Sequence, residues 1–459
     1  MEQTFPDFKR LYLRIALGVL TLMAIITYIL RPFDVSMPFN YFCFGLFLVS
    51  TTIYFILKEK KNYLDFDTIF IIFLAIIGFA YPVFIYDETN PYNIAFSLSF
   101  DTKFIPTGSI LFVLGFQSFF WGSLLTKQHH IQTQKDISQK AINNTALSII
   151  VILLCLAFLL SGGVQYYRNV YFYRLEVQNS GLLFQIMALL HAFSIVAIAT
   201  EFYNKVVDRD YRINIILTIA ITIVIFLMLF AGNRTLASQL ALPVLGLYTM
   251  YFKRVGFLSF IGFSLLGIIM MFVVQISRSG KDFASVEDSA DILVDLTIPT
   301  RSTYSCMEYV EEHGHLHGKN LMGGIIGTVP SLERILVGTI GLNSREIGSA
   351  EILTDYTLGP NPYVGLGTNI LADIFLSFDL IGSMILMFLL GVFVSKQQQG
   401  ALKLNYYAVV TYASLLSFSL YLVRTTYTHP TKLIVWCLII ALLNKSLSQK
   451  LFDQNTCEA

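Results

Sequence analysis

Apolar runs alternate with short polar segments along almost the whole chain, from Leu11 to Leu443. A helix needs about 20 apolar residues to cross the hydrocarbon core of a bilayer. About twelve runs meet or approach that length, and the last is the shortest. The pattern therefore predicts an all-α, polytopic membrane protein of about twelve transmembrane helices. The predicted spans are 11–30, 41–57, 68–86, 108–125, 146–160, 182–203, 213–231, 236–252, 257–276, a span centred on 381–394, 406–423 and 433–443.

Composition agrees with this fold class. Of 459 residues, 55% are hydrophobic and only 13% are charged, whereas an ordinary soluble domain has about 25% charged residues. The net charge of +1 provides no basic face of the kind that nucleic acid requires, so nucleic acid is not an expected partner. The five cysteines show no CxxC spacing, so we predict neither a disulfide framework nor a cysteine metal site.

Basic residues cluster in every second loop, which indicates the orientation of the chain. Loops rich in Lys and Arg stay in the cytoplasm. We therefore expect both termini in the cytoplasm and the remaining loops on the outer side of the membrane. The basic loop residues are Lys58, Lys60, Lys61, Lys127, Lys135, Lys140, Lys205, Arg209, Arg212, Lys253, Arg254, Lys396 and Lys403.

The longest outer segment follows Ile276 and has roughly 90 residues, a length that in a compact protein indicates a functional or disordered loop. Its tyrosines, isoleucines and leucines make it too apolar for disorder. We expect helices that cover the membrane domain. The chain then divides into a bundle of nine spans (1–276), the outer segment (277–365), and an outer or re-entrant helix with three further spans (366–459).

Arginines on the outer side need their own explanation, because the positive-inside rule accounts only for the cytoplasmic ones. One interpretation is that they are interfacial anchors reaching lipid phosphates. Their number favours a shared anion site, since guanidinium groups bind phosphate bidentately. In particular, we predict that Arg234, Arg278 and Arg424, each at the outer end of a span, converge on one pocket. The outer-side candidates are Arg168, Arg174, Arg234, Arg278, Arg301 and Arg424.

The stretch 365–396, GLGTNILADIFLSFDLIGSMILMFLLGVFVSK, is too long for one span. As a continuous helix it would measure roughly 48 Å, against a hydrocarbon core of about 30 Å. We predict an outer helix from about Thr368 to Ser377, capped by Thr368 and the glycines before it, then a break around 379–382 and the span proper.

Polar residues recur along one face of that outer helix. Asn369, Asp373 and Ser377 follow one another at intervals of four, so they form a stripe that we expect to face a site. An ionisable residue at membrane depth is a functional candidate by default. The alternative for Asp373 is a structural salt bridge to an outer-side arginine.

These features together resemble the Wzy-type O-antigen and oligosaccharide repeat-unit polymerases. The resemblance covers roughly 153–429 and rests on YYRNVYFYR, the GNRT turn, SRSG at the start of the long outer segment, and GLGTNILADIFLSFDLIG. In that family a glycine-rich entry precedes an acidic residue, an aromatic residue and a Phe-Gly pair. Asp373 matches the acidic position, and Phe375 matches the aromatic position. Asp379 stands after Phe378 where the family has glycine, although Gly382 is retained.

The resemblance implies a C-type glycosyltransferase fold in the bacterial inner membrane, with its site on the periplasmic side. The substrates it implies are undecaprenyl pyrophosphate-linked oligosaccharides, both donor and acceptor, held among membrane lipids. A chain-length regulator protein is a candidate partner. Neither a cofactor nor a metal is expected, and HGHLHG (313–318) is interpreted as a loop turn, since it lacks a further ligand at metal-binding spacing.

The implied reaction assigns roles to the candidate residues. A pyrophosphate leaving group needs positive charge, which the outer arginines supply. The acceptor hydroxyl needs a general base, for which the candidates are Asp373, Glu287 and His429. Tyr304 and Asn369 are additional candidates for contact with pyrophosphate or sugar.

Two alternatives share the same substrates. One is an O-antigen ligase-like transferase, which would use a different acceptor at a similar pyrophosphate site. The other is a flippase or transporter of lipid-linked sugars, without catalysis. The chain has no evident internal repeat and carries a long outer segment, and both features weigh against a carrier.

Overall fold

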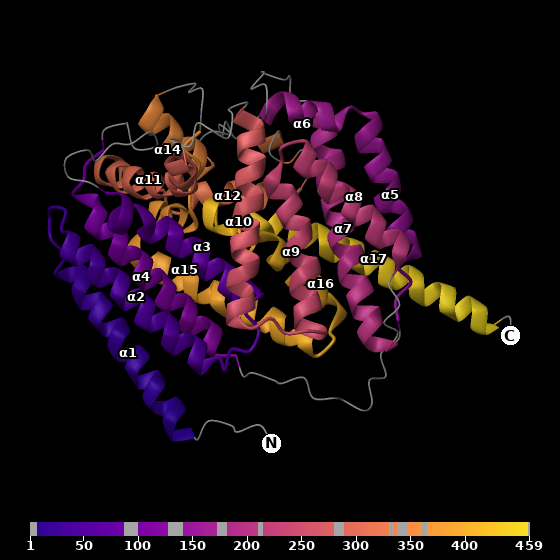
Figure 1. The fold of residues 1–459 in the computed structure, drawn as a ribbon, viewed down its shortest axis with the longest axis horizontal. Helices are drawn as coiled ribbons and strands as arrows, with labels where there is room; N and C mark the ends of the chain where they lie inside the picture. Colours follow the sequence, from indigo (N-terminus) through magenta and orange to yellow (C-terminus); the bar gives the residue numbers. More distant parts are fainter. Residues whose placement is uncertain are drawn as a thin grey trace.

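The computed structural model describes residues 7–86, 100–126, 141–171, 181–209, 214–279, 289–329, 332, 335–336, 347–359 and 365–457, and every element in these ranges is helical (Figure 1). The first part of the chain forms α1 (Asp7–Ile29), α2 (Met37–Leu57), α3 (Phe66–Phe79), η1 (Ala80–Ile85), α4 (Phe104–Leu124), α5 (Thr145–Leu160), α6 (Gly163–Tyr171), α7 (Gly181–Val207), α8 (Ile215–Phe230), α9 (Arg234–Tyr251) and α10 (Phe257–Ser279). The second part forms α11 (Ser289–His313), η3 (Lys319–Leu321), α12 (Met322–Ile326), α14 (Ser349–Leu358), α15 (Ile370–Leu402), α16 (Tyr406–Phe418), η5 (Leu422–Arg424) and α17 (Pro430–Cys457).

Each predicted span coincides with a helix, and the polytopic membrane character is confirmed. Within the described residues, seven helices are long and apolar enough to cross a membrane, or eight if the bent pair of α5 and α6 is one span. Helices α8 and α16 are apolar but shorter. The total of about twelve spans stays a prediction.

Helices α4 and α15 form the centre of the bundle, and glycines bring their backbones into contact. A Cβ placed on Gly122 would lie 1.9 Å from Phe388 O, and one on Gly391 would lie 2.2 Å from Phe119 O. No other residue fits at either position without separating the helices. This close pair fixes the height of α15 in the bundle.

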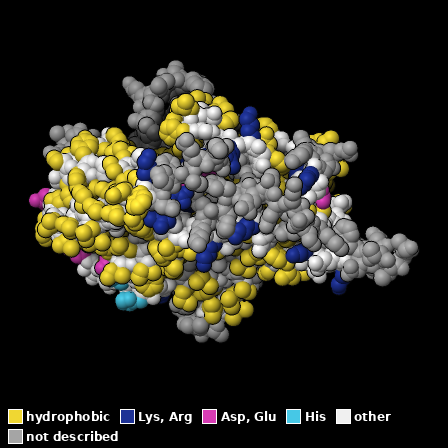
Figure 2. Space-filling view, turned by 90° about the horizontal axis from the view of Figure 1, so that it is seen from below, with side chains coloured by type: hydrophobic (Ala, Val, Ile, Leu, Met, Phe, Trp, Pro, Cys, Tyr) yellow, Lys and Arg dark blue, Asp and Glu magenta, His cyan; other side chains and the backbone are white. Residues whose placement is uncertain are grey.

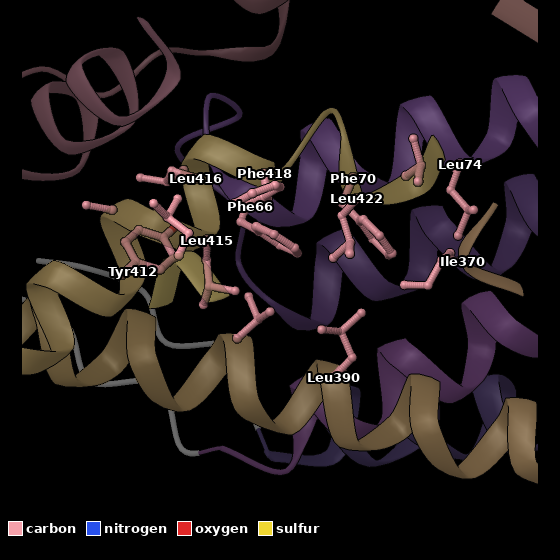
Figure 3. Packing of buried hydrophobic residues seen from close by; sticks show 14 of the residues in the cluster. Phe66, Phe70, Leu74, Ile370, Leu390, Tyr412, Leu415, Leu416, Phe418 and Leu422 are labelled. Carbon is pink, nitrogen blue, oxygen red and sulfur yellow. The ribbon is translucent and has the colours of Figure 1, made fainter. Parts of the chain in front are cut away.

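Apolar side chains from four elements interlock beside this pair (Figure 3). Because the chain passes directly from α16 into η5, this packing fixes where the turn after α16 begins. The labelled residues are Phe66, Phe70 and Leu74 of α3, Ile370 and Leu390 of α15, Tyr412, Leu415, Leu416 and Phe418 of α16, and Leu422 of η5.

The described parts of the outer segment are helical, as the sequence predicted. Figure 1 shows α11, α12 and α14 gathered at one end of the bundle, with the N-terminus at the opposite end. Helix α11 packs against α3, α4, α14 and α15. The opposite end, seen in Figure 2, displays many Lys and Arg side chains. Exposed basic residues of the loops there include Lys61, Lys253, Arg254, Lys396 and Lys403.

The predicted break in the late span is confirmed at Asp379. This residue has φ 58° and ψ −161°, and it divides α15 into an outer piece and a longer inner piece. That conformation is reached almost only by glycine, which gives a physical reason for the glycine of the related sequences. The predicted cap is corrected: Asn369 caps the outer piece rather than Thr368, because Asn369 Oδ1 accepts from Ala372 N at 2.9 Å.

The turn formed by HGHLHG completes this break. The last carbonyls of a helix lack partners within the helix. Leu316 N donates to Leu376 O at 2.9 Å, and His317 N donates to Ser377 O at 3.2 Å. The ring of His315 adds a contact of 3.1 Å from Nδ1 to Phe375 O. The histidine-rich turn therefore caps the outer piece of α15.

Candidate functional site

The polar stripe on the outer piece of α15 faces the protein interior, and its three side chains are fully buried. Asn369 anchors the stripe to α11, because its Nδ2 donates to Pro299 O at 2.7 Å and to Thr303 Oγ1 at 2.8 Å. The stripe thus connects α15 with the outer segment. In this conformation the Asn369 amide is engaged by protein and is not open to a ligand.

Asp373 lies at the centre of the stripe and bonds to two other segments. Its Oδ1 accepts from Asn320 Nδ2 in η3 at 2.8 Å, and its Oδ2 accepts from the Tyr427 amide at 2.8 Å. Asn320 also accepts a hydrogen bond from Ser377 Oγ. The partners of the Asp373 carboxylate are therefore the Asn320 side chain, the Tyr427 backbone amide and the Ser349 hydroxyl, rather than the arginine of the alternative interpretation.

The turn between α16 and α17 is held by further contacts on either side of Tyr427. Thr428 Oγ1 donates to Leu321 O at 2.9 Å, and Tyr427 OH donates to Leu386 O at 3.0 Å. The turn is therefore docked on both η3 and α15. It carries Arg424 at one end and His429 at the other.

His429 is the predicted base that the structure leaves accessible. Its side chain is exposed, while the rings of Phe418 and Tyr421 lie 5.5 and 5.6 Å from it between centroids. The surrounding protein lowers the pKa of His429, and the charge of Lys432 lowers it further. A lowered pKa favours the neutral imidazole, which is the form that can accept a proton.

Arg234 and Arg424 lie at the same end of two neighbouring helices. Helices α9 and α16 pack together, and a Cβ on Gly246 of α9 would lie 2.8 Å from Leu416 Cδ1 of α16. The two helices run in opposite directions, so Arg234 at the start of α9 and Arg424 after α16 lie toward the same side of the bundle (Figure 1). Leu416 is in the last turn of α16, whereas Gly246 follows Arg234 by 12 residues, about 18 Å of helix, so α16 ends beside the second half of α9 rather than beside Arg234.

Arg168 reaches the same region from α6. Its guanidinium carbon lies 5.0 Å from the ring centroid of Phe230, the last residue of α8. The turn from α8 to α9 follows directly and leads to Arg234. A cation over an aromatic face is held in place without losing its charge. Arg168 and Arg234 therefore belong to one end of the bundle.

Arg301 is a residue of α11 and lies in a different environment. Its side chain is 1% exposed and contacts Ser305 Oγ at 2.6 Å, Glu308 Oε2 at 3.5 Å and the ring of Phe100 at 4.7 Å. Burial lowers the pKa of Arg301, and the charge of Glu308 opposes that effect. Tyr304 is equally buried and stacks on Phe100 at 5.2 Å. Both residues pack the outer segment, so ligand contact by either would require that segment to move.

Three predicted residues lie outside what the structure describes. Arg174 and Glu287 fall outside the described ranges, and for Arg278 only the backbone, at the end of α10, is described. The predicted convergence of Arg278 with Arg234 and Arg424 stays a prediction.

Sequence reasoning missed two residues of this region. Asn320 has no periodic partner in the sequence, and only its position just after the glycine of HGHLHG singles it out. Lys432 stands one helical turn after His429, with its Nζ 5.7 Å from the ring of Phe184 and 5.4 Å from that of Trp436. It is a further cation at the outer start of α17, and a prediction restricted to arginines did not include it.

A protein-family model matches nearly the whole chain. The model described as O-antigen polysaccharide polymerase Wzy matches residues 12–454. Comparison with curated proteins and with solved structures gave no significant match.

Proposed function

Because this chain belongs to the Wzy family of O-antigen polysaccharide polymerases, we propose that it joins lipid-linked oligosaccharide repeat units into O-antigen or a similar surface polysaccharide. It is a membrane enzyme of the glycosyltransferase type. The single observation that carries the proposal is the family match over residues 12–454. The arginines at one end of the bundle add a chemical reason.

The proposed location is the bacterial inner membrane, with both termini in the cytoplasm. The basic end in Figure 2 supports this orientation, because Lys and Arg mark the cytoplasmic side. The end that carries α11, α14 and the turn with Arg424 and His429 would then face the periplasm. A bundle of about twelve spans with a C-type glycosyltransferase fold is part of the same proposal.

The donor in this proposal is a polyprenyl pyrophosphate that carries the growing chain. Its leaving group bears negative charge that must be stabilised as the bond to the sugar breaks. Arg168, Arg234 and Arg424 are the proposed pyrophosphate ligands among the described side chains. Arg174 and Arg278 are proposed to join them. No nucleotide sugar is needed in this proposal, because the donor already carries its leaving group. The arginines are proposed to supply the positive charge that a metal ion would otherwise provide.

The acceptor hydroxyl needs a base, and His429 is the best supported of the predicted bases. It is accessible and stands on the same turn as Arg424, and its lowered pKa favours the neutral form. Asp373 is less well suited in this conformation, because it is buried and both of its oxygens accept hydrogen bonds. Glu287 stays a proposed base, and it lies outside the residues that the structure describes.

The test is a reconstituted reaction. Purified protein in liposomes is supplied with undecaprenyl pyrophosphate-linked repeat units and, separately, with the lipid A core as acceptor. A ladder of lengthened lipid-linked chains supports the polymerase. Transfer to the lipid A core alone would instead indicate a ligase. Movement of intact substrate across the bilayer without a covalent product would indicate a transporter.

A further inference from the structure

Asn320 occupies a position where every polar atom of its side chain is used. It is 1% exposed, and its Nδ2 donates to both Asp373 O and Asp373 Oδ1, each at 2.8 Å. Its Oδ1 accepts from Ser377 Oγ. A primary amide has two N–H donors and one acceptor oxygen, so this is a matched set. An aspartate would offer no donor, and an alanine would leave buried groups without partners.

The Asp373 carboxylate connects Asn320 to the turn between α16 and α17. One of its oxygens faces Asn320 and the other accepts from the Tyr427 amide, so the two bonds share one rigid group. Tyr427 lies on the turn that bears Arg424 and His429. A second tie runs parallel to the first, from Thr428 Oγ1 to Leu321 O. Two consecutive residues of the turn, Tyr427 and Thr428, are therefore connected to η3: Tyr427 through the Asp373 carboxylate and Thr428 directly.

We propose that the Asn320–Asp373 pair positions the turn between α16 and α17 for sugar transfer, and that Asp373 acts through this contact and not as the base. The inference rests on the proposed function, since the reacting groups it positions are Arg424 and His429. It makes the outer segment part of the catalytic geometry. A shift of η3 would be passed through one side chain and one carboxylate to the backbone of the turn.

The test exchanges the two residues. Asn320→Asp places two carboxylates against each other, and Asp373→Asn places two amides there, so each single variant should lower kcat about tenfold or more with little change in donor KM. In the double variant, the amide oxygen introduced at position 373 can accept from the Tyr427 amide, while the amide nitrogen beside it donates to the carboxylate introduced at position 320. The bond from position 320 to the carbonyl of residue 373 is not restored, because a carboxylate has no donor. The double variant should therefore recover part of the kcat that Asp373→Asn loses.

The same exchange would overturn the inference if the double variant were folded yet no more active than Asp373→Asn. The carboxylate at position 373 would then be required for itself, as a base must be. Singles with wild-type kcat would overturn it as well. Asn143→Asp is the matched control, because it adds the same charge at an exposed position where the new carboxylate can still accept from Thr145 N. It should leave kcat unchanged.

The kcat of Thr428→Val and the hydrogen exchange of the turn test the same contact if an exchanged variant is unstable or if no polymer forms. Thr428→Val removes the parallel tie without a change of shape, and it should lower kcat severalfold at an unchanged melting temperature. Wild-type kcat in Thr428→Val would contradict the inference. Hydrogen exchange of the amides at 425–429 should be faster in the single variants and slower again in the double variant. Failure of wild-type protein to polymerise would refute the proposed function alone, and unchanged exchange rates would refute the pair.

Discussion

Gly382 lies directly against Phe378 across the break in α15, so close that a Cβ on Gly382 would lie 2.1 Å from Phe378 Cβ. Real Cβ atoms do not approach to this distance. Gly382→Ala should therefore destabilise the protein by about 1–3 kcal/mol, the usual cost of overpacking. The melting temperature in lipid nanodiscs checks this. Gly45→Ala is the control, since a Cβ there meets nothing within 4 Å, and a melting temperature equally lowered in both variants would contradict the explanation.

Asp379 holds a backbone conformation that costs a residue with a side chain about 1–3 kcal/mol. Its φ is 58° and its ψ is −161°. Asp379→Gly should remove that strain. Glycine loses more chain entropy on folding, about 0.5–1 kcal/mol, and this loss offsets part of the gain in stability. We expect a melting temperature equal to or above that of wild type. Asp379→Ala keeps a Cβ and should bring no gain, so a rise in both variants would point to the lost charge instead.

Arg424 is expected to act by its shape as well as its charge. A planar guanidinium binds two phosphate oxygens at once, whereas an ammonium is a point charge. Arg424→Lys should therefore lower polymer yield about tenfold or more at normal protein abundance. Arg278→Lys should behave in the same way. Near-wild-type yield in either variant would show that the residue contributes only its positive charge. Lys403→Arg, at the opposite end of the bundle, is the control and should leave the polymer yield unchanged.

The base proposed here predicts a particular pH dependence. His429 must be neutral to accept a proton, and its pKa lies below the ordinary value of about 6.5. The midpoint of the acid limb of the rate should therefore lie below about pH 6.5. Stability follows the same sign, because the unfolded chain binds this proton more readily, so unfolding is favoured as pH falls below about 6.5.

Lys432 gives a specific check on that profile. Its positive charge disfavours the imidazolium form of His429, so Lys432→Gln should raise the pKa of His429 and move the acid limb to higher pH. The midpoint of the rate against pH is the measurement. An unmoved midpoint would show that another group is the base.

The sequence alone determined the membrane class, the helical content and the break in α15. These follow from local properties: apolar length sets a span, and a run of 365–396 exceeds one hydrocarbon core. It also placed Arg234 and Arg424 at the ends of apolar runs. The family motif marked the position of Asp379, although it did not reveal that the backbone there would accept an aspartate in a glycine-like conformation.

Only the tertiary structure decided which of the polar residues meet. The periodicity of Asn369, Asp373 and Ser377 predicted one face but not its neighbours. Asp373 and Ser377 meet Asn320, more than fifty residues away along the chain, and Asn369 meets α11. The sequence likewise could not separate Arg301, buried in packing, from the arginines at the end of the bundle. The physical reason is that helix geometry is set by contacts within a few residues, while the partner of a buried polar group depends on how distant segments pack.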